Sequence, residues 1–417
     1  MKINCFIPFL NPAQAEETIT SLKASKLVNK IYLLTDSNSK STVDGCESIN
    51  IDSLNSTATI RQIAANTDTL YTLIYTKHDI LRLGMFALDR MVQIANDSNA
   101  GMVYSDHYQV IGGEMRNSPV IAYQEGSLRD DFNFGSVLLY DSAALKKAVE
   151  GMNTEYRFAG LYDLRLKVSK HSDIVHINEY LYTEIENDTR KSGEKNFDYV
   201  DPKNREVQIE MEQACTDHLK KTGAYLAPQF KEVDFNKENF EYEASIIIPV
   251  RNRVRTINDA IESVLRQKTS FKFNLIVVDN YYTEGTTEAI DKFAFDERLI
   301  HIIPENKELG IGGCWNAGVH HPKCGRFAIQ LDSDDIYSDE NTLQKIVDAF
   351  YEQNCAMVVG TYMLTDFSLQ MLPPGVINHK EWTPDKGRNN ALRINGLGAL
   401  RAFFTPLLRE IKVPNTS

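Results

Sequence analysis

The chain has 417 residues and a hydrophobic content of 42%, so its length favours two domains, each able to bury an apolar core. Acidic residues (57) outnumber basic ones (45), the formal net charge is −12, and no Lys/Arg block stands out, which disfavours a nucleic-acid partner and a membrane-surface anchor. No run is apolar and long enough for a transmembrane segment, and no signal peptide is evident. The six cysteines lack the spacing of a zinc site or a disulfide framework. We therefore expect a cytoplasmic protein.

The first half begins with two predicted strands separated by a predicted helix. Residues 3–9 and residues 31–36 are the two apolar runs. The same order returns at residues 245–250 and 275–279, where β-branched residues dominate and the second run again ends in an acid. The helix between these later runs is predicted from apolar residues at spacings of three and four, namely Val254, Ile257, Ile261, Val264 and Leu265. Strand, helix and strand in this order are typical of a βαβ unit in a parallel sheet.

The two halves match each other along much of their length. Residues 71–80 align without a gap to residues 327–336 at an offset of 256 (335 − 79), and Gly135 aligns to Gly398 at an offset of 263 (398 − 135). Small loop insertions would produce this drift, so we interpret the pattern as a tandem duplication. The sequence therefore predicts an α/β protein of two tandem Rossmann-like domains with mainly parallel central sheets.

The boundary between the domains is predicted from a change in composition. Residues 201–221 have helical character, whereas residues 228–243 are polar, acidic and without period. We place the first domain at residues 1–228, the linker at residues 229–242 and the second domain at residues 243–417.

An Asp-x-Asp tripeptide follows the apolar run at residues 327–331. Asp332 and Asp334 would stand at the carboxyl edge of the sheet, where open α/β folds bind ligands. Carboxylates in this pattern can share Mg²⁺ or Mn²⁺, which keeps open positions for the oxygens of a nucleoside diphosphate and neutralises charge as the diphosphate leaves. Taken alone, the tripeptide is equally consistent with a cluster of N-cap residues before a helix.

Three further motifs lie upstream of this tripeptide in the same half. Residues 245–252 form a strand that ends in a Pro-x-x-Asn turn, residues 279–287 begin with Asp and continue as a turn rich in Thr, and residues 306–318 are rich in Gly and end in Asn-x-Gly. Together with Asp-x-Asp at residues 332–334, they make residues 243–417 resemble the family 2 glycosyltransferases of the GT-A fold.

The resemblance implies a role for residues in each motif. Those expected to bind the donor nucleotide or to lie beside it are Pro249, Val250, Arg251, Asn252, Asp279, Asn316, Gly318, Asp332 and Ser333. In the family, the Pro-x-x-Asn turn lines the base pocket and the strand-end Asp binds the base, so Asp279 is expected to do so here. Asp332 and Asp334 are implied to hold the metal and to act in catalysis. Trp315 stands where many members carry a basic residue. Each motif also has a structural reading, because proline ends strands and glycine permits helix packing.

The resemblance further implies a metal-dependent inverting glycosyltransferase. It would move a sugar from a nucleotide-diphosphate donor, expected to be a UDP-sugar, to a glycan or other hydroxyl acceptor in polysaccharide or glycoconjugate biosynthesis. Two alternatives remain open. One is a non-catalytic module that binds sugar nucleotides or proteins. The other is a sugar nucleotidyltransferase, although no basic, glycine-rich phosphate loop follows the first strand.

The first half keeps the strand and helix pattern of the repeat but lacks the Asp-x-Asp carboxylates. Residues 76–78 read Thr-Lys-His where the second half carries Asp-Ser-Asp, so we expect a pseudo-catalytic GT-A-like domain. The general base of the family is implied to lie in a Glu-Asp-like motif, whose relic in the first half contains Asp163. Ser417 aligns with residue 154 (417 − 263), before that position. We therefore assign no base and expect the second domain to be truncated at its C-terminus.

Overall fold

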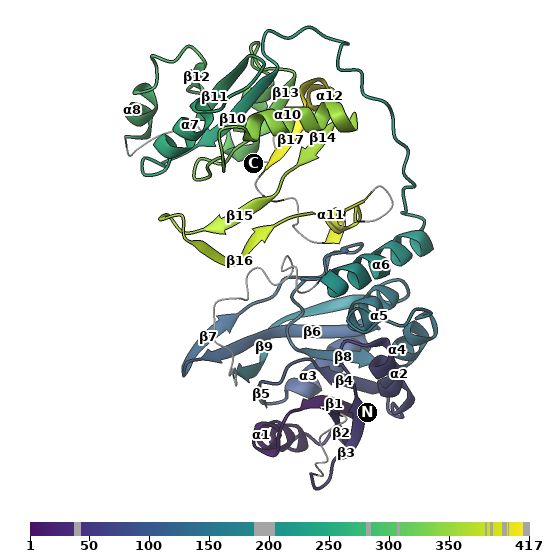
Figure 1. Cartoon of the computed structure of the whole chain (residues 1–417). Helices are drawn as coiled ribbons and strands as arrows, with labels where there is room; N and C mark the ends of the chain where they lie inside the picture. Colours follow the sequence, from purple (N-terminus) through teal and green to yellow (C-terminus); the bar gives the residue numbers. More distant parts are fainter. Residues whose placement is uncertain are drawn as a thin grey trace. The chain divides into compact units, whose positions relative to one another are not determined.

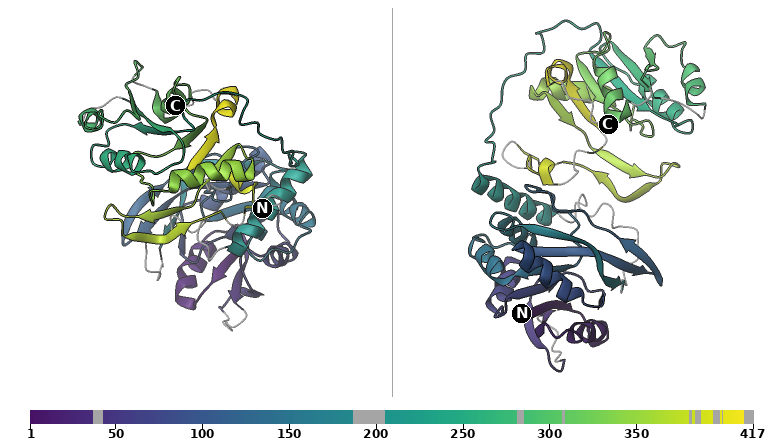
Figure 2. Two further views of the ribbon diagram at one scale, coloured as in Figure 1. Left: turned by 45° about the horizontal axis from the view of Figure 1, so that its top comes forward. Right: turned by 180° about the vertical axis from the view of Figure 1, so that it is seen from behind.

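The computed structural model describes residues 1–36, 43–186, 205–280, 285–306, 309–379, 382–383, 387–393, 398 and 400–411 (Figures 1 and 2). It divides into two compact units. The first comprises Met1–Leu226 and Glu381–Ile394, and the second comprises Ala227–Lys380 and Asn395–Ser417. A short segment late in the sequence is therefore part of the first unit.

The first unit is built on one mixed sheet. Its elements, in chain order, are β1 (Ile3–Phe9), α1 (Pro12–Lys23), β2 (Val28–Asp36), β3 (Glu47–Ile51), α2 (Thr57–Ala65), β4 (Tyr71–Tyr75), β5 (Ile80–Leu83), α3 (Ala87–Ser98), β6 (Met102–Ile111), β7 (Glu114–Ser118), β8 (Val137–Asp141), α4 (Ser142–Glu150), α5 (Gly160–Val168), β9 (Ile174–Ile185), α6 (Arg205–Thr222) and, from the late segment, α11 (Asn390–Arg393). The strand order is β3-β2-β1-β4-β8-β6-β9-β5, with β7 paired to β6. β8 is antiparallel to both of its neighbours, whereas β3, β2, β1 and β4 are mutually parallel.

The second unit repeats the part of this sheet that runs from β3 to β6. Its elements are β10 (Ala244–Val250), α7 (Ile257–Leu265), β11 (Phe273–Asp279), α8 (Thr286–Asp291), β12 (Leu299–Ile302), α9 (Gly310–Val319), β13 (Phe327–Gln330), α10 (Thr342–Gln353), β14 (Met357–Val359), β15 (Tyr362–Thr365), β16 (Met371–Ile377), β17 (Arg401–Phe404) and α12 (Thr405–Ile411). The strand order of its main sheet is β12-β11-β10-β13-β17-β14 (Figure 1), and β15 pairs with β16 in a separate antiparallel ribbon.

The two sheets correspond strand for strand. β3-β2-β1-β4-β8-β6 in the first unit matches β12-β11-β10-β13-β17-β14 in the second, and in both the fifth strand of this order is antiparallel to its neighbours. Gly135 and Gly398 precede the matching strands β8 and β17, and both have left-handed backbone conformations (φ 69° and 63°). The structure thus confirms the predicted α/β fold of two tandem domains with mainly parallel central sheets.

Continuous apolar runs form the central strands because both faces of each sheet are covered by helices. Every residue of β1, β10 and β11 is buried. The buried face of α7 is close to the prediction, with Ile257, Ile261 and Val264 inside. Val254 is an exception, because it precedes the helix and is 37% exposed. Among the described helices, none combines the length and the apolar character needed to cross a membrane.

Candidate functional site

Three neighbouring parallel strands of the second unit end at one edge of the sheet. Val250, the last residue of β10, is in register with Asp279, the last residue of β11. On its other side, β10 pairs with β13, and the N–H of Leu331 donates to the carbonyl of Ile247 at 3.2 Å. Because the carboxyl ends of parallel strands meet at the same edge, Asp279 and Asp332 both lie at the rim where open α/β sheets bind ligands.

The Asp-x-Asp tripeptide forms a tight turn at this rim. The N–H of Asp335 donates to the carbonyl of Asp332 at 3.1 Å, Ser333 is buried, and Asp334 is exposed. The next helix, α10, begins at Thr342 and its N-cap is Asn341. The alternative that this tripeptide is a helix N-cap cluster is therefore wrong, since the helix starts too far along the chain.

The carboxylates in this turn repel each other. Burial and the charge of Asp334 raise the pKa of Asp332, although the nearby Arg401 opposes the rise. Burial and the charges of Asp332 and Asp334 raise the pKa of Asp335 to about 6. The fold thus keeps several carboxylates close together although they repel one another. Shifted pKa values of this kind are typical of functional sites.

Two arginines that sequence reasoning missed lie near these acids. Arg401 is the first residue of β17, and its Nε is buried without a hydrogen-bond partner among the described residues. Arg253 follows the β10 turn and places its Nε 3.9 Å from Oδ2 of Asp334, with both side chains exposed, so this ion pair is weak. Neither arginine belongs to the Asp-x-Asp motif, and only the sheet topology places Arg401 beside β13.

Asp279 lies deeper at the same edge and is fully buried. Its Oδ2 accepts a hydrogen bond from the hydroxyl of Thr287 and lies 3.4 Å from Nε2 of His301, whereas Oδ1 has no partner among the described residues. The hydrogen bond to Asp279 raises the pKa of His301, although burial alone would lower it. Asp291 adds to the rise. Buried carboxylate oxygens normally have donors, so Oδ1 is available for a donor group on a ligand.

The turn after β10 is held against the turn after β11. Pro249 is the penultimate residue of β10 and Arg251, just beyond it, is exposed. Asn252 has a left-handed backbone conformation (φ 53°), which Asn tolerates better than most residues. The N–H of Asn280 donates to the carbonyl of Val250 at 2.9 Å. The predicted Pro-x-x-Asn turn thus lies next to the end of β11, where Asp279 stands.

The glycine-rich stretch forms α9, which packs on β10 and β11. A Cβ added to Gly318 would lie 2.5 Å from Cγ2 of Ile247, so glycine is required there for close packing of the helix on the strand. The carbonyl of Asn316 accepts the N–H of His320 at 3.0 Å within the helix end. Trp315 is half-buried, and its Nε1 has no partner among the described residues. Donor contacts for Asn316 and Gly318 therefore stay predictions.

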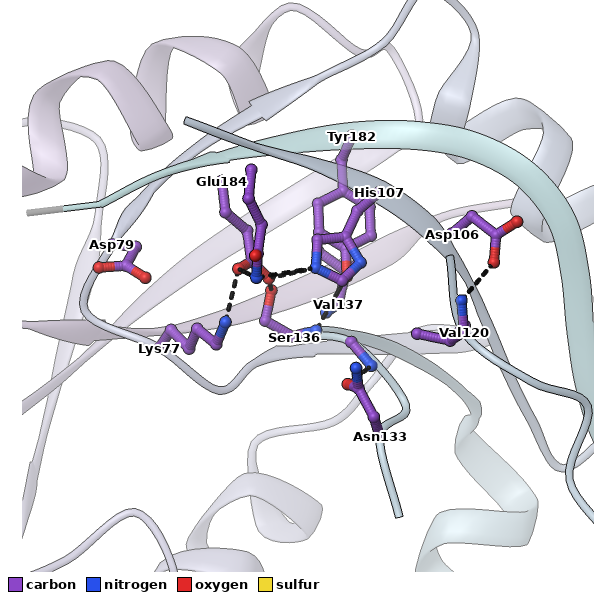
Figure 3. Close-up of polar contacts among 12 residues, drawn as sticks. Lys77, Asp79, Asp106, His107, Val120, Asn133, Ser136, Val137, Tyr182 and Glu184 are labelled. Atoms are coloured by element: carbon purple, nitrogen blue, oxygen red, sulfur yellow. Dashed lines mark hydrogen bonds and ion pairs between the residues drawn. The ribbon is translucent and has the colours of Figure 1, made fainter. Parts of the chain in front are cut away.

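The matching edge of the first unit is built differently (Figure 3). Lys77, at the position of Ser333, donates from Nζ to Oε2 of Glu184 at 2.5 Å. The hydroxyl of Ser136 donates to the other oxygen of the same carboxylate. His107 stacks on Tyr182, with ring centroids 5.0 Å apart. Burial would raise the pKa of Glu184, but Lys77, Ser136 and His107 together hold it below its usual value.

The nearby Asp106 is also committed to internal contacts. Its Oδ1 accepts the N–H of Val120 at 2.9 Å, a bond drawn in Figure 3, and lies 2.8 Å from Nε2 of His176. In this unit the sheet edge therefore carries a neutralised, internally paired cluster instead of adjacent carboxylates facing one another.

Comparison with known proteins identifies relatives of this part of the chain. A family model described as "Glycosyl transferase family 2" matches residues 245–399. The protein named UDP-Glc:alpha-D-GlcNAc-diphosphoundecaprenol beta-1,3-glucosyltransferase WfgD, of Escherichia coli, is 32% identical over 122 residues, which are 29% of this chain and 46% of that protein. Minor teichoic acid biosynthesis protein GgaB of Bacillus subtilis is 28% identical over 118 residues, which are 28% of this chain and 13% of that protein.

The chain spans about half the length of the first two curated relatives that it matches. Among solved structures, TarS 1–349 of S. aureus has a TM-score of 0.38 at 11% identity, over 52% of this chain and 65% of that one. This score is too low to bear on the fold, which rests on the strand order itself. The motifs, their common edge and the family match agree, and residues 245–399 of this chain are a glycosyl transferase family 2 domain.

Proposed function

We propose that the second unit transfers a sugar from a UDP-linked donor to a hydroxyl group of a glycan or other acceptor, with inversion and with a divalent cation. The observation that carries this proposal is the joint position of Asp279 and the Asp-x-Asp turn at one carboxyl edge. The two sites are separated by β10, so they lie about 10 Å apart, given a spacing of about 4.8 Å between strands. That separation suits a nucleoside diphosphate whose base and phosphates bind at opposite ends.

Asp279 would recognise the base. Uracil presents one N–H donor flanked by two carbonyls, and Oδ1 of Asp279 is a buried acceptor without a partner among the described residues. Thr287 and His301 fix the carboxylate through its other oxygen. A base that supplied the missing donor would satisfy this oxygen and would be held in one orientation.

The acids at the rim suit a hard divalent cation. Asp332 and Asp334 offer oxygen ligands. Burial and then the charge of Asp334 raise the pKa of Asp332, and Mg²⁺ or Mn²⁺ would relieve the repulsion between the two acids. Within the described residues there is no group of three or more His, Cys, Asp or Glu side chains that could hold a metal by themselves. We therefore propose that the diphosphate oxygens of the donor complete the ligand set, as is common for Mg²⁺.

In the proposed reaction, the acceptor oxygen attacks the anomeric carbon while the bond from that carbon to the diphosphate breaks. The cation, when bound, stabilises the charge on the departing diphosphate. Arg253 and Arg401 stand near the same acids and would add positive charge on the phosphate side. The acceptor hydroxyl must lose its proton, and we assign no general base.

We also propose that the first unit is not catalytic. The support is the ion pair between Lys77 and Glu184, which occupies the edge where the second unit has its two acids. A cation already fixed at that position opposes the binding of a metal ion.

The named relatives suggest the biological setting. One carries the transfer of glucose to a lipid diphosphate-linked sugar in its name, and the other is named for teichoic acid biosynthesis. We propose by analogy that this chain acts in the assembly of a polysaccharide or glycoconjugate.

The test is product formation. The full chain is incubated with Mn²⁺, a panel of UDP-sugars and GDP-sugars, and hydroxyl acceptors, and the anomeric configuration of any product is read by NMR. We expect transfer from at least one UDP-sugar with inversion. Transfer with retention, or from GDP-sugars alone, would contradict the proposal. Nucleotide binding without transfer across the panel would favour the non-catalytic binding module.

A further inference from the structure

The β15–β16 ribbon of the second unit forms a sheet of its own and ends in a turn with exposed apolar side chains (Figure 1). We call this turn, residues 366–370, the ribbon tip. Phe367 is 80% exposed, Leu369 is 61% exposed, and Met371, the first residue of β16, is 64% exposed. Singly exposed apolar residues are common on protein surfaces, but a group of three at one turn is typical of a binding surface.

Hydrogen bonds to Asp366 fix the shape of the ribbon tip. Its Oδ1 accepts the N–H groups of Ser368 at 2.8 Å and of Gln370 at 2.9 Å, and its own N–H donates to the carbonyl of Gln370 at 2.9 Å. Leu369 has a left-handed backbone conformation (φ 61°), which is uncommon for residues other than glycine and costs conformational energy. The ribbon tip therefore presents its apolar side chains from a fixed and strained backbone.

The corresponding hairpin of the first unit lacks these side chains. The start of β6 pairs with β8 as β14 pairs with β17, so the β6–β7 hairpin corresponds to the β15–β16 ribbon. Its turn contains Gly112 and Gly113, which both have left-handed conformations (φ 60° and 86°), and a Cβ at either would meet no atom within 4 Å. The second unit instead keeps a side chain at Leu369 despite the strain. The apolar tip thus belongs to the unit that carries the Asp-x-Asp acids.

One turn contacts both the ribbon tip and the proposed donor edge. It follows β10, and the N–H of Thr256 donates there to the carbonyl of Arg253 at 3.1 Å. From this turn, Arg253 places its Nε 3.9 Å from Oδ2 of Asp334, and the guanidinium of Arg255 lies 5.8 Å from the ring centroid of Phe367. A guanidinium at this distance attracts an aromatic ring, so Arg255 helps to orient Phe367. The ribbon tip therefore lies beside the turn that also contacts the Asp-x-Asp acids.

The molecule that must bind beside these acids is the acceptor. In the proposed reaction, the acceptor oxygen attacks the anomeric carbon, which is attached to the diphosphate near Asp332 and Asp334. The C–H groups of a pyranose ring form an apolar face that can pack on an aromatic side chain while the hydroxyl groups at the ring edge stay in water. An anionic lipid surface fits less well, because the ribbon tip carries the exposed acid Asp366.

We infer that the ribbon tip binds the acceptor, and that Phe367 is an acceptor-binding residue that packs on the apolar face of a sugar ring. This inference rests on the proposed function and deepens it, because it narrows the hydroxyl acceptor to a carbohydrate. The donor is bound elsewhere on the same edge, so the ribbon tip should affect acceptor binding without affecting UDP binding.

The test compares Phe367→Ala with the parent and with Phe295→Ala. Phe295 is similarly exposed (82%) in the turn between α8 and β12, so it is the matched control. Saturation-transfer NMR is recorded with maltose, lactose and N,N′-diacetylchitobiose, with and without UDP and Mn²⁺. We expect the parent to transfer saturation to the ring C–H protons of at least one disaccharide. The affinity for that disaccharide should fall about five- to tenfold in Phe367→Ala and stay unchanged in Phe295→Ala.

A second variant, Leu369→Gly, separates binding from folding. Glycine adopts the left-handed conformation without strain, so this variant should melt no lower than the parent although it binds the disaccharide more weakly. Calorimetry with UDP and Mn²⁺ should give the same affinity in the parent and in all three variants.

Unchanged disaccharide affinity in Phe367→Ala, or an equal loss in Phe295→Ala, would overturn the role of Phe367. The absence of saturation transfer to every disaccharide in the parent would overturn the carbohydrate assignment. Binding to dioleoylphosphatidylcholine vesicles that needs Phe367, without any effect on disaccharides, would assign the ribbon tip to a lipid surface instead. If the parent fails to bind UDP with Mn²⁺, the proposed function fails, whereas the disaccharide measurement still decides whether the ribbon tip binds a carbohydrate.

Discussion

The matching carboxyl edges of the two sheets have the same strand framework but different charged groups. At the end of β4, the ammonium of Lys77 is paired with a buried carboxylate, Glu184, and the cluster is satisfied from within. At the end of β13, the pKa values of Asp332 and Asp335 are raised because both side chains are half-buried and stand next to other carboxylates. The acid of the first edge already has a cationic partner, whereas the proposed divalent cation would relieve the repulsion at the second edge.

The difference shows that a duplicated fold can keep its framework while the charged groups at its edge change. β1, β2 and β4 match β10, β11 and β13 in order and direction, so the framework does not depend on the acids. Glu184 comes from β9, which pairs with β6 outside the matched part of the sheet. An added strand thus supplies the carboxylate that Lys77 needs, and the framework remains intact while the chemistry changes.

The largest effect is expected from removing one acid at the second edge. Asp332→Asn should lower the rate of transfer by about 100- to 1000-fold, a range seen when an electrostatic group at a reacting centre is lost. Asp339→Asn is the matched control, because Asp339 is an acid paired with the exposed Lys345 beyond the turn. Steady-state rates with a UDP-sugar and Mn²⁺ make the comparison. Equal rates for Asp332→Asn and the parent would remove Asp332 from the site.

The next effect concerns stability at the first edge. Lys77→Met should destabilise the protein by about 1–2 kcal/mol, because it leaves the buried carboxylate of Glu184 without its cation. The cost is below the usual range for a buried pair since Lys77 is 41% exposed and Ser136 still donates to Glu184. Urea unfolding measures it, and UDP binding should stay unchanged. A variant as stable as the parent would show that this pair does not hold the edge together.

A smaller effect tests base recognition. Asp279→Asn should weaken UDP binding about tenfold, because an amide is a poorer acceptor than a carboxylate for the base N–H. N3-methyl UDP lacks that donor, so the parent should bind it more weakly than UDP. The parent and the variant should bind N3-methyl UDP with about the same affinity. If methylation costs the parent and the variant equally, Asp279 does not contact that position of the base.

The smallest effect is a pH dependence that arises at His301. Its pKa is raised above the reference value of 6.5, chiefly by the hydrogen bond to Asp279. The protonated form is therefore favoured in the folded protein, so this contribution to stability is complete below pH 6.5 and disappears as pH rises through the folded pKa. Compared with His301→Asn, the parent should melt up to about 4 °C higher near pH 5.5 and show a smaller gap near pH 8.5. An exposed histidine variant, His320→Asn, serves as the control, and an identical gap at both pH values would contradict the link.

Much of the framework could be predicted because short stretches of sequence determine its strands and helices. The buried strands are continuous apolar runs, and the repeat of the first half in the second fixed which strands correspond. The Asp-x-Asp turn and Asp279 were also recognisable, because each directly follows such a run. Once β10, β11 and β13 are identified as parallel neighbours, it follows that their carboxyl ends lie at one edge of the sheet.

Residues that act through distant partners could not be predicted in this way. Arg401 reaches the site because β17 inserts between β13 and β14, and no local pattern records that order. His301 reaches Asp279 from the neighbouring strand β12, and as a single histidine it has no motif. Arg393 finds its partner at Asp130, in the other half of the chain. The N-cap interpretation of the acids was wrong because it placed the start of α10 too early.

The contrast between the two edges is tested most directly by counting bound metal. Mn²⁺ is titrated into the full chain with saturating UDP, and the stoichiometry is read by calorimetry or by the loss of the free-ion paramagnetic resonance signal. We predict one ion per chain, with binding lost in Asp332→Asn and kept in Lys77→Met. Two ions per chain, or one ion that survives Asp332→Asn, would show that the cation is not held where the two sheets differ.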